Sequence, residues 1–526
     1  MPESSTLTQN QSVRRIELLD TTLRDGEQTQ GVAFSKEEKF TLARQLLTQV
    51  RVDRIEVASA RVSEGEKAAV AEIAAWAEQQ GRERAVEVLG FCDHDRSADW
   101  VGEAGCRVMN LLAKGSERHL AGQLKKTAEQ HVADIAKTVE YCNQHGIACN
   151  CYPEDWSNGM LEQSGYCMWL LGQLAQLPIE RVMLPDTLGI LNPTQSGEMV
   201  ARIVEAHPQT RFDFHCHNDY GLATANSLAA ACAGAHGVHV TVNGLGERAG
   251  NAPLDEFAVA AKDLYGFETG VQEECLVDVA RLVESFSGRR LAANKPITGE
   301  AVFTQTAGIH ADGDKKGDLY VTKLRAERFG RSRTYALGKL AGKASLDLNL
   351  ERLGLELNED QKKLILKRII ELGDQKRSLT ADDLPFIIAD VLKSPSDRTI
   401  VIEDCVISTT MHVVPTATIK VRYKAEVRQG SATGDGGYDA FMKALRRLLG
   451  EFAVEVPQLL DYEVHIPPGG QTDALVETTI TWEGGVRTRG VDSDQLKAAI
   501  VATEHMLNIV ERGKAPDNAS KPEDQP

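Results

Sequence analysis

The sequence predicts an α/β protein that begins with a (β/α)8 barrel, and three observations lead to this prediction. Between residue 14 and about residue 265, short β-branched or apolar runs alternate with longer segments of helical apolar spacing. Eight such units fit into roughly 250 residues, the count and length of a (β/α)8 barrel. Polar motifs follow the expected strands, where barrel active sites are built. A doubly wound open sheet would usually have fewer strands.

The expected strands are short, and a helical segment follows each of them. After the first strand, Ala43, Leu47 and Val50 recur with the spacing of one helix face. The strands are expected at Arg15–Leu19, Arg54–Val57, Val86–Phe91, Arg107–Leu112, Ile147–Tyr152, Arg181–Leu184, Arg211–His215 and Val238–Val242.

Residues 266–395 have a different, mostly helical pattern. They include one polar stretch with several glycines, Gly308–Gly317, which we expect to be a functional loop. From Thr399 onward the pattern changes to alternating strands, expected at Thr399–Ile407, Ala417–Val427 and Ala474–Trp482.

This C-terminal part also contains a faint internal repeat. Strand-rich segments lead to Gly434–Leu445 and again to Gly490–Ile500, and in both a glycine turn and Asp residues precede an apolar-periodic helix. The repeat predicts a small pseudo-symmetric α+β domain. Because 526 residues are too many for one core, we expect separate domains. The expected divisions are a disordered N-terminus at 1–13, a catalytic barrel at 14–290, a helical connector at 291–395, the α+β domain at 396–512 and a disordered tail at 513–526.

Composition excludes several classes of function. The net charge of −17 argues against nucleic acid as the main partner, although a few local Arg or Lys residues can still bind a small anion. No segment approaches the roughly 20 consecutive apolar residues of a membrane helix, and Met1–Ser12 has no signal pattern, so we expect a cytoplasmic protein. The ten cysteines form no CxxC pair, which argues against a zinc ribbon or a disulfide framework.

The strongest local signal is the run from Phe214 to Asp219, which places His215 and His217 two residues apart at the end of the seventh strand. Residues two apart on a strand point to the same side, so both imidazoles project together while Cys216 faces away. The pair is a candidate metal site. The alternative is two hydrogen-bonded core histidines.

Two further motifs supply oxygen donors. Asp25, directly after the first strand, offers a carboxylate, and Arg24 beside it can hold an anionic oxygen. Asn251 ends a glycine-rich run after the eighth strand and offers a carbonyl oxygen. Asp25, His215, His217 and Asn251 together suit a divalent metal ion, and the donor set does not choose among Mg²⁺, Mn²⁺ and Zn²⁺. Each motif alone also fits an ordinary polar loop.

The runs DTTLRDGEQ, HCHND and NGLGERAGN resemble the DRE-TIM metallolyase superfamily, whose fold is a TIM barrel. More narrowly, the chain resembles the Claisen-condensing branch of 2-isopropylmalate, citramalate and homocitrate synthases, and this resemblance covers nearly the full length. It implies that a metal binds the keto and carboxylate oxygens of a 2-oxo acid. A base then removes a proton from the methyl group of acetyl-CoA, the enolate attacks, and hydrolysis of the thioester releases CoA.

The resemblance also implies roles for single residues. Arg24 matches the arginine that stabilises charge at the condensing oxygens, and Glu154 matches the catalytic acid. His310 matches a histidine that family homodimers bring over a barrel, and Tyr320 matches a tyrosine near the acetyl-CoA site. Thr187 would donate a hydrogen bond to the substrate carboxylate. Without the resemblance, Glu154, His310 and Tyr320 would more often be solvent-facing or capping residues than catalytic ones.

Three residues at strand ends are expected to face the side chain of the 2-oxo acid. Leu89, Leu112 and Tyr152 would leave a small apolar pocket that suits the methyl group of pyruvate. This favours a citramalate synthase of isoleucine biosynthesis over a 2-isopropylmalate synthase of leucine biosynthesis, which must admit an isopropyl group. A methyl group or two is worth only ~1–3 kcal/mol of discrimination, so 2-oxoisovalerate stays the alternative substrate.

The C-terminal domain resembles the regulatory domain of this branch, which binds the end-product amino acid, here isoleucine or leucine. The segment Ala432–Tyr438 is the expected contact with that effector, and a plain tight turn before a helix is its alternative. Two other classes of function remain: a carbon–carbon lyase of the same superfamily, and a non-catalytic amino-acid sensor that keeps the barrel as a scaffold.

Overall fold

A computed structural model describes residues 13–317, 319–352, 355–374, 399–465 and 476–513, together with Leu384, Ile387, Ile388 and Val391. The chain divides into two compact units. The first comprises Met1–Thr304 and Val321–Thr334, and the second comprises Gln305–Tyr320 and Tyr335–Pro526.

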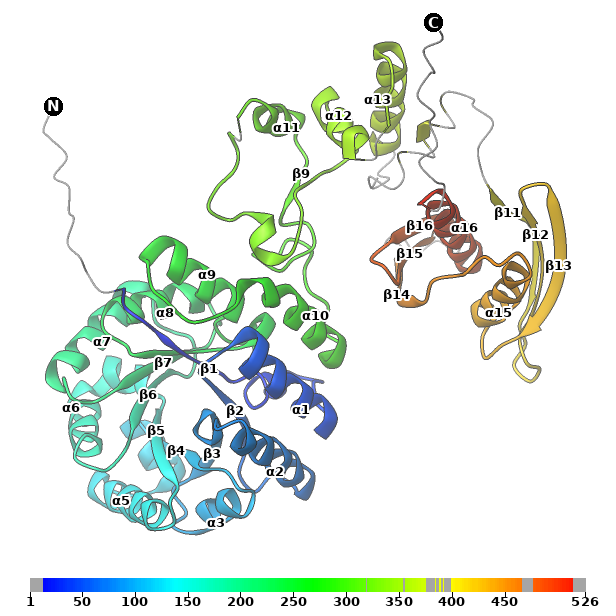
Figure 1. The fold of residues 1–526 in the computed structure, drawn as a ribbon. Coiled ribbons are helices and arrows are strands. Elements are labelled where there is room, and N and C mark those ends of the chain that lie inside the picture. Colours follow the sequence, from blue (N-terminus) through cyan, green and yellow to red (C-terminus); the bar gives the residue numbers. More distant parts are fainter. Residues whose placement is uncertain are drawn as a thin grey trace, which may run out of the picture. The chain divides into compact units, whose positions relative to one another are not determined.

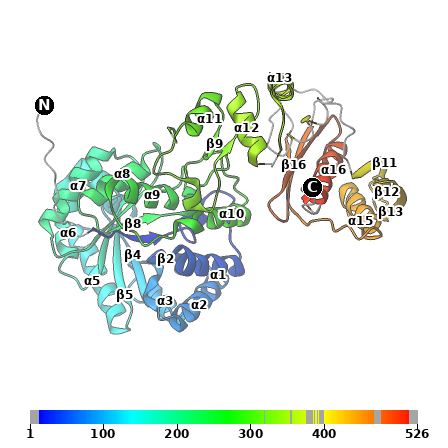
Figure 2. The same cartoon turned by 45° about the horizontal axis from the view of Figure 1, so that its top comes forward.

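The first unit is a closed barrel of eight parallel strands in sequence order, with helices around it (Figures 1 and 2). The predicted strands are confirmed, and their ends differ from the prediction by at most two residues. The strands are β1 Glu17–Asp20, β2 Arg54–Ser59, β3 Val86–Phe91, β4 Val108–Lys114, β5 Ala148–Glu154, β6 Arg181–Asp186, β7 Phe212–Cys216 and β8 Gly237–Val240.

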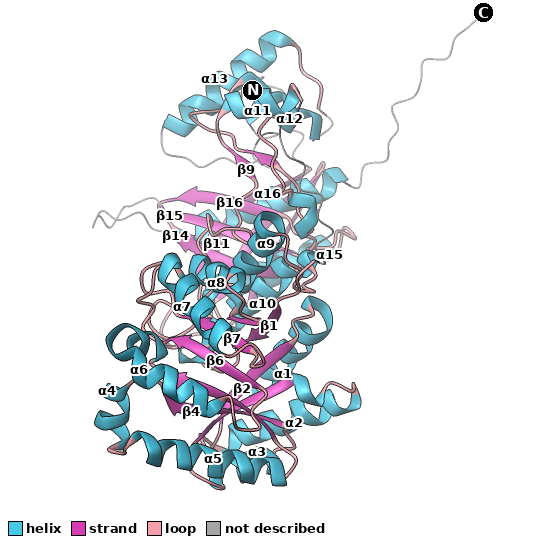
Figure 3. Cartoon of the chain, turned by 90° about the vertical axis from the view of Figure 1, so that its left-hand side faces the viewer, coloured by secondary structure: helices cyan, strands magenta, loops and turns pink. Residues whose placement is uncertain are grey.

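Several of the surrounding helices start at residues whose side chains satisfy free backbone N–H groups. Ser35, Thr127 and Asn192 each form a capping box at a helix start, and Pro193 follows Asn192 as the first helical residue. The helices of this unit are α1 Lys36–Arg44, α2 Glu64–Gln79, α3 Arg96–Glu103, α4 Glu117–His119, α5 Ala128–Gln144, α6 Trp156–Leu174, α7 Pro193–Ala206, α8 Ala223–Cys232, α9 Leu254–Tyr265 and α10 Leu276–Ser287 (Figure 3).

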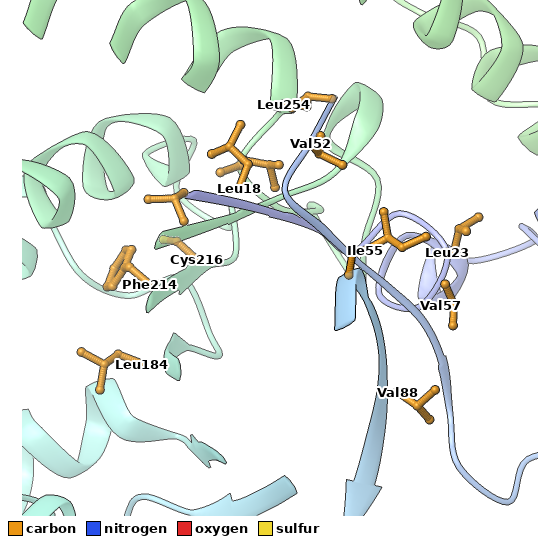
Figure 4. Close-up of a cluster of buried hydrophobic side chains, with 14 of the residues drawn as sticks. Leu18, Leu23, Val52, Ile55, Val57, Val88, Leu184, Phe214, Cys216 and Leu254 are labelled. Atoms are coloured by element: carbon orange, nitrogen blue, oxygen red, sulfur yellow. The ribbon is translucent and has the colours of Figure 1, made fainter. Parts of the chain in front are cut away.

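Strand alternation separates an apolar layer from a polar barrel interior. On β7, Phe214 and Cys216 are fully buried, and the Phe214 ring meets that of Trp156 on α6 edge to face. Figure 4 shows Phe214 and Cys216 among other side chains of the same apolar cluster. Asp213 and His215 occupy the alternate positions and are buried among polar side chains. The period of two therefore directs apolar groups to the helices and polar groups inward.

Charged side chains near the start of the strands fill one end of the barrel interior. Arg54 donates to Glu87 Oε1 over 2.8 Å and to Asp213 Oδ2 over 2.5 Å, and Arg181 Nη1 lies 3.1 Å from Asp213 Oδ1. Burial alone would raise the pKa of Asp213, but the two guanidinium groups and His239 hold it well below its ordinary value. The barrel core is therefore closed by a compensated ion-pair network rather than by apolar side chains.

The connector contains helices and one departure from the prediction. Gly308–Gly317, which we expected to be a loop, forms helix α11 over Gly308–Lys315. Its glycines serve close packing: a Cβ on Gly308 would overlap Gly342, and one on Gly313 would overlap the ring of Tyr320. The other elements are β9 Thr304–Gln305, β10 Thr334–Tyr335, α12 Lys343–Arg352 and α13 Glu359–Asp374.

The C-terminal region confirms the predicted repeat. Each copy is a three-stranded antiparallel sheet followed by a helix, and both copies contribute to one apolar core. The first copy is β11 Ile400–Ser408, β12 Thr416–Tyr423, β13 Glu426–Thr433 and α15 Gly437–Gly450, and the second is β14 Leu459–His465, β15 Val476–Trp482, β16 Arg487–Asp492 and α16 Gln495–Gly513.

One predicted strand in this region is wrong. Ala417–Val427 is not a single strand but most of a hairpin, in which Tyr423 pairs with Glu426 across the turn. Lys424 adopts a positive φ of 54°, a conformation that turn positions require and that lysine does not signal in a sequence.

The predicted disordered ends, 1–13 and 513–526, lie outside the described residues except for Val13 and Gly513. The predicted boundary between connector and C-terminal domain, at 395 and 396, lies outside them as well. Within the parts of the chain that are described, no helix is long and apolar enough to cross a membrane.

Replacing Arg54 by methionine tests the ion-pair network. The variant leaves Glu87 and Asp213 buried without their shared cation, so we expect the free energy of unfolding to fall by about 3–5 kcal/mol near neutral pH. Because folding lowers the pKa of Asp213, the stabilisation is present above the pKa of an unfolded carboxylate, about 4, and is lost as pH falls through the lower folded value.

Denaturant unfolding of wild type and Arg54→Met over a range of pH measures both effects. Arg84→Met is the matched control, because Arg84 is exposed and pairs with Glu180 at the surface. An equal loss for the two variants, or a difference that does not shrink in acid, would contradict the assigned network.

Candidate active site

A cluster of buried nitrogen and oxygen donors lies where β1, β7 and β8 end. His215 Nε2 and His217 Nε2 are 3.3 Å apart and lie 3.5 and 3.9 Å from Asp25 Oδ2. All three residues are at least 94% buried, and one donor atom from each lies within 4.8 Å of the others. The alternation predicted for the His215–His217 run places both imidazoles on the same side, with Cys216 facing away.

Asn251 completes this cluster. Its Nδ2 donates to Asp25 Oδ1 over 3.0 Å and to the Leu245 carbonyl over 3.1 Å. Among the described residues, no group bonds to its buried Oδ1. The donor set thus contains one amide oxygen left free for a further ligand.

The glycines of the preceding loop make this position of Asn251 attainable. Gly246 and Gly250 have φ angles of +153° and +83°. A Cβ on Gly250 would overlap the Gly244 carbonyl, and one on Gly246 would overlap the Asn251 amide. The glycine-rich run therefore forms a tight turn, and this turn places the amide side chain of Asn251 in the cluster.

The charge states in the cluster suit cation binding. Burial lowers the pKa of His215 and that of His217, so both imidazoles are neutral near pH 7 and can act as ligands. Burial alone would raise the pKa of Asp25, but Arg24 and the two histidines hold it below its ordinary value. A carboxylate, two neutral imidazoles and an amide oxygen form a mixed donor set for a divalent metal ion.

Arg24 is fixed beside the cluster by two carboxylates. Its Nη1 donates to Asp25 Oδ2 over 2.8 Å, and its Nε donates to Glu56 Oε2 over 2.5 Å. Asn110 donates to the other oxygen of Glu56 over 2.8 Å and receives a hydrogen bond from Asn150. Burial would lower the pKa of Arg24, but Glu56 and Asp25 raise it above its ordinary value, so the guanidinium stays charged.

Glu56 was not among the predicted site residues, although the sequence contains a signal for it. It is a fully buried carboxylate between Ile55 and Val57 on β2. Charged residues are almost never fully buried unless they are paired, so a glutamate in a strand core indicates a buried cation nearby.

Leu89, Leu112 and Tyr152 form one small apolar cluster with Leu19 and Met183. Their packing is consistent with one shared wall, and their role toward the side chain of the 2-oxo acid stays a prediction.

The Tyr152 ring of this cluster is fixed by contacts that the sequence did not predict. Its hydroxyl group lies 2.9 Å from His239 Nδ1, and its ring meets that of His215 edge to face at 6.0 Å. His239 Nε2 lies 3.6 Å from Asp213 Oδ2. His239 therefore links Tyr152 of the apolar cluster to the ion-pair network.

Glu154 and Thr187 lie at the ends of β5 and β6. Glu154 forms an ion pair with Lys114, the last residue of β4. The Thr187 hydroxyl accepts a hydrogen bond from the Asp155 N–H group over 3.0 Å, which leaves its own hydrogen available to a ligand.

His310 and Tyr320 belong to the second unit and lie next to each other there. Their ring centroids are 4.2 Å apart, and His310 Nδ1 lies 3.1 Å from Gln305 Oε1. The Tyr320 ring packs closely against Gly313 of α11, the helix that carries His310. The structure thus groups these two residues with each other, and it groups the remaining predicted residues in the barrel.

The segment Ala432–Tyr438 joins β13 to α15. A Cβ on Gly434 would overlap the backbone of Ala440, and the Asp435 N–H group donates to Asp439 Oδ2 over 2.9 Å. Tyr438 is largely buried, and its hydroxyl group lies 2.7 Å from Thr503 Oγ1. These contacts are those of a tight turn before a helix, and a role in effector binding stays a prediction.

Three family models match the chain in succession. Residues 15–283 match the HMGL-like model, residues 297–377 match the homocitrate synthase post-HMGL domain-like model, and residues 378–511 match the LeuA allosteric (dimerisation) domain. The chain belongs to the HMGL-like family.

Curated relatives extend over most of the chain. A putative (R)-citramalate synthase of Methanopyrus kandleri is 36% identical over 88% of this chain and 89% of its own length. A probable 2-isopropylmalate synthase of the same organism is 37% identical over 95% and 99%. An (R)-citramalate synthase of Methanocaldococcus jannaschii is 32% identical over 94% and 99%.

A solved structure was also found to be similar to part of this chain. The hydroxymethylglutaryl-CoA lyase of Pseudomonas aeruginosa is 21% identical, with a TM-score of 0.47, over 55% of this chain and 98% of its own.

His217→Ala tests the metal site without a turnover assay. Loss of one imidazole from a four-donor set should weaken Mn²⁺ binding by at least about 100-fold, because loss of a mere supporting contact already costs 10–100-fold. Isothermal titration and the EPR signal of free Mn²⁺ measure the affinity. His145→Ala is the control, since His145 is exposed at the end of α5. Equal Mn²⁺ affinity in wild type and His217→Ala would exclude the assigned ligand.

Proposed function

We propose that this chain is an acyltransferase that condenses acetyl-CoA with a small 2-oxo acid and releases CoA, with pyruvate as the acceptor and (R)-citramalate as the product. The observation that supports this proposal most is that three features lie together in the barrel, toward the ends of its strands. These are the metal-type donor cluster, the fixed cation of Arg24 and the small apolar cluster around Tyr152. The family membership and the relatives' names are consistent with the same reaction class.

The residues of the cluster fit a divalent metal ion. Asp25, His215, His217 and the free Oδ1 of Asn251 would hold it, and Mg²⁺, Mn²⁺ and Zn²⁺ all suit these donors. When bound, such an ion supplies Lewis-acid polarisation of a carbonyl oxygen.

The protein's own groups would orient the acceptor and stabilise its charge. Arg24 presents a guanidinium that Glu56 and Asp25 hold in place before any substrate arrives. Such a preorganised cation stabilises negative charge that develops on an oxygen during condensation. Thr187 offers a hydroxyl hydrogen to the carboxylate of the 2-oxo acid.

Proton transfers are assigned to Glu154 and His310. Glu154 lies at the end of β5, on the rim where barrel enzymes place their catalytic groups. The imidazole of His310 lies tilted against the Tyr320 ring, and its Nδ1 contacts Gln305. The roles of His310 and Tyr320 toward acetyl-CoA, and their contribution to a neighbouring subunit of a homodimer, rest on the family resemblance.

The apolar cluster favours pyruvate over larger acceptors. Leu89 is 7% exposed and Tyr152 is 3% exposed, so both side chains are packed in place. Two such large side chains beside the acceptor would favour a methyl group over an isopropyl group. Sequence identity does not choose between the two substrates, since the relatives named citramalate synthase and 2-isopropylmalate synthase are 36% and 37% identical. 2-Isopropylmalate formation from 2-oxoisovalerate is therefore the second candidate.

The match of residues 378–511 to the LeuA allosteric (dimerisation) domain supports a homodimer whose activity an amino acid controls. Isoleucine is the effector that fits citramalate formation, and leucine is the effector that fits 2-isopropylmalate formation.

A substrate panel tests the proposed reaction. CoA release from acetyl-CoA, read out as free thiol, is measured with pyruvate, 2-oxoisovalerate, 2-oxobutyrate and 2-oxoglutarate in the presence of Mn²⁺. We expect the highest kcat/KM with pyruvate and inhibition by isoleucine. A lead for 2-oxoisovalerate would move the assignment to 2-isopropylmalate formation, and no release with any acceptor would refute the condensation itself.

Leu89→Ala tests the pocket assignment. Removing the isobutyl group should raise the ratio of kcat/KM for 2-oxoisovalerate to that for pyruvate by about 10-fold or more, the scale of one or two methylene groups in an apolar pocket. Leu264→Ala, on an exposed position of α9, is the matched control. An unchanged ratio in Leu89→Ala would show that the acceptor side chain lies elsewhere.

A further inference from the structure

We propose that Lys114 is a positioning residue that holds the Glu154 carboxylate in place at the end of β5. This inference rests on the proposed function, because it concerns the position that Glu154 occupies during turnover. Lys114 and Glu154 are register partners at the last position of β4 and β5, and the ammonium group donates to Glu154 Oε2. The lysine side chain is 11% exposed and the glutamate side chain 24%, so solvent screens this pair only in part.

The backbone of Lys114 is held from two neighbouring helices. Its N–H group donates to His131 Nε2 on α5 over 2.9 Å, and its carbonyl accepts from the Tyr166 hydroxyl on α6 over 2.9 Å. Burial lowers the pKa of His131 to about 4, so the imidazole is neutral and can accept. A surface lysine would not have these two backbone contacts. They fix the backbone of Lys114, and the ion pair with Glu154 then places the ammonium group.

The two strand ends are also held against each other. The N–H group of Gly115 donates to the Glu154 carbonyl over 2.6 Å, and a Cβ on Gly115 would collide with the Pro153 carbonyl. Asp155 then takes a positive φ of 63° and starts α6. The close approach, which needs glycine at position 115, brings the lysine and glutamate side chains together.

No other cation competes for Glu154 among the described residues. The neighbouring carboxylate of Asp155 has its own partners, since Ser116 and Asn158 donate to it over 2.6 and 2.7 Å. The titratable and charged groups that surround the pair on the adjacent elements are Cys92, Arg118, His119, His131, Asp155 and Tyr166. Arg118 and His119 face Asp155, at 3.8 and 3.4 Å, rather than Glu154.

This arrangement has a consequence for catalysis. The Glu154 side chain can rotate about several bonds, and the ion pair with Lys114 restricts its orientation. A misplaced catalytic group lowers the rate of the chemical step. Lys114 should therefore affect kcat through the position of Glu154.

Separate values of kcat and KM for Lys114→Met, Lys114→Arg and wild type test the proposal. In Lys114→Met the Glu154 carboxylate loses the group that holds it, so we expect kcat to fall by at least about tenfold while KM for pyruvate changes by less than about twofold. Lys114→Arg keeps a cation at this position and should restore most of kcat. Lys36→Met removes an exposed ion pair with Glu72 and should change neither quantity.

Two results would overturn the proposal. A kcat of Lys114→Met that equals the wild-type value would show that Lys114 does not position Glu154. A fall of kcat in Lys114→Arg as large as that in Lys114→Met would show that a cation at this position does not hold Glu154.

Unfolding measurements separate this proposal from the proposed function. In a double-mutant cycle, Glu154→Gln should lower the unfolding midpoint of wild type but leave that of Lys114→Met unchanged, whether or not the protein releases CoA. Lys114→Arg and Glu154→Gln complete the comparison if Lys114→Met does not fold. If wild type releases no CoA but Glu154→Gln lowers the unfolding midpoint only when Lys114 is present, the condensation alone is refuted. If Glu154→Gln lowers the midpoint equally in wild type and in Lys114→Met, the ion-pair role is refuted.

Discussion

The barrel of this protein depends on the pairing of charges that it buries. At one end of its interior, Arg54 and Arg181 neutralise Glu87 and Asp213, and at the other end Arg24 neutralises Glu56 and Asp25. Asn110 and Asn150 join the two groups through amide hydrogen bonds. A buried charge without its partner is strongly destabilising, so each charged side chain restricts the position of the side chain it pairs with. The donor cluster is the outer end of this chain of contacts.

The same network explains why the site is rigid before substrate arrives. Asp25 can face His215 and His217 because Arg24 compensates its charge, and Arg24 stays in place because Glu56 holds its Nε. The apolar cluster is connected to the same network, because the Tyr152 hydroxyl group contacts His239 and His239 contacts Asp213. A site built on strands with such support is more precisely placed than one built on loops.

Much of the fold and part of the site could be predicted from the sequence. The period-two alternation of the His215–His217 run and the apolar runs of the strands are local signals, and the structure bears them out. The loop expected at Gly308–Gly317 is a helix, because its glycines serve contacts with Gly342 and Tyr320 that are made only in the folded chain.

The partners of the predicted residues were harder to find. Glu56, His239 and Lys114 each make a contact with a residue far away in the sequence, and such contacts leave no spacing pattern in one sequence.

The most direct test of the account is the distance between a bound acceptor and the metal site. Paramagnetic relaxation of pyruvate labelled with ¹³C at its keto carbon is measured with the Mn²⁺-loaded protein. We predict strong relaxation of the keto carbon that 2-oxoglutarate does not compete away and that disappears in Asp25→Asn. A relaxation rate equal to that of pyruvate with free Mn²⁺, in a protein shown to bind the metal, would contradict the central claim that Asp25, His215 and His217 organise the acceptor.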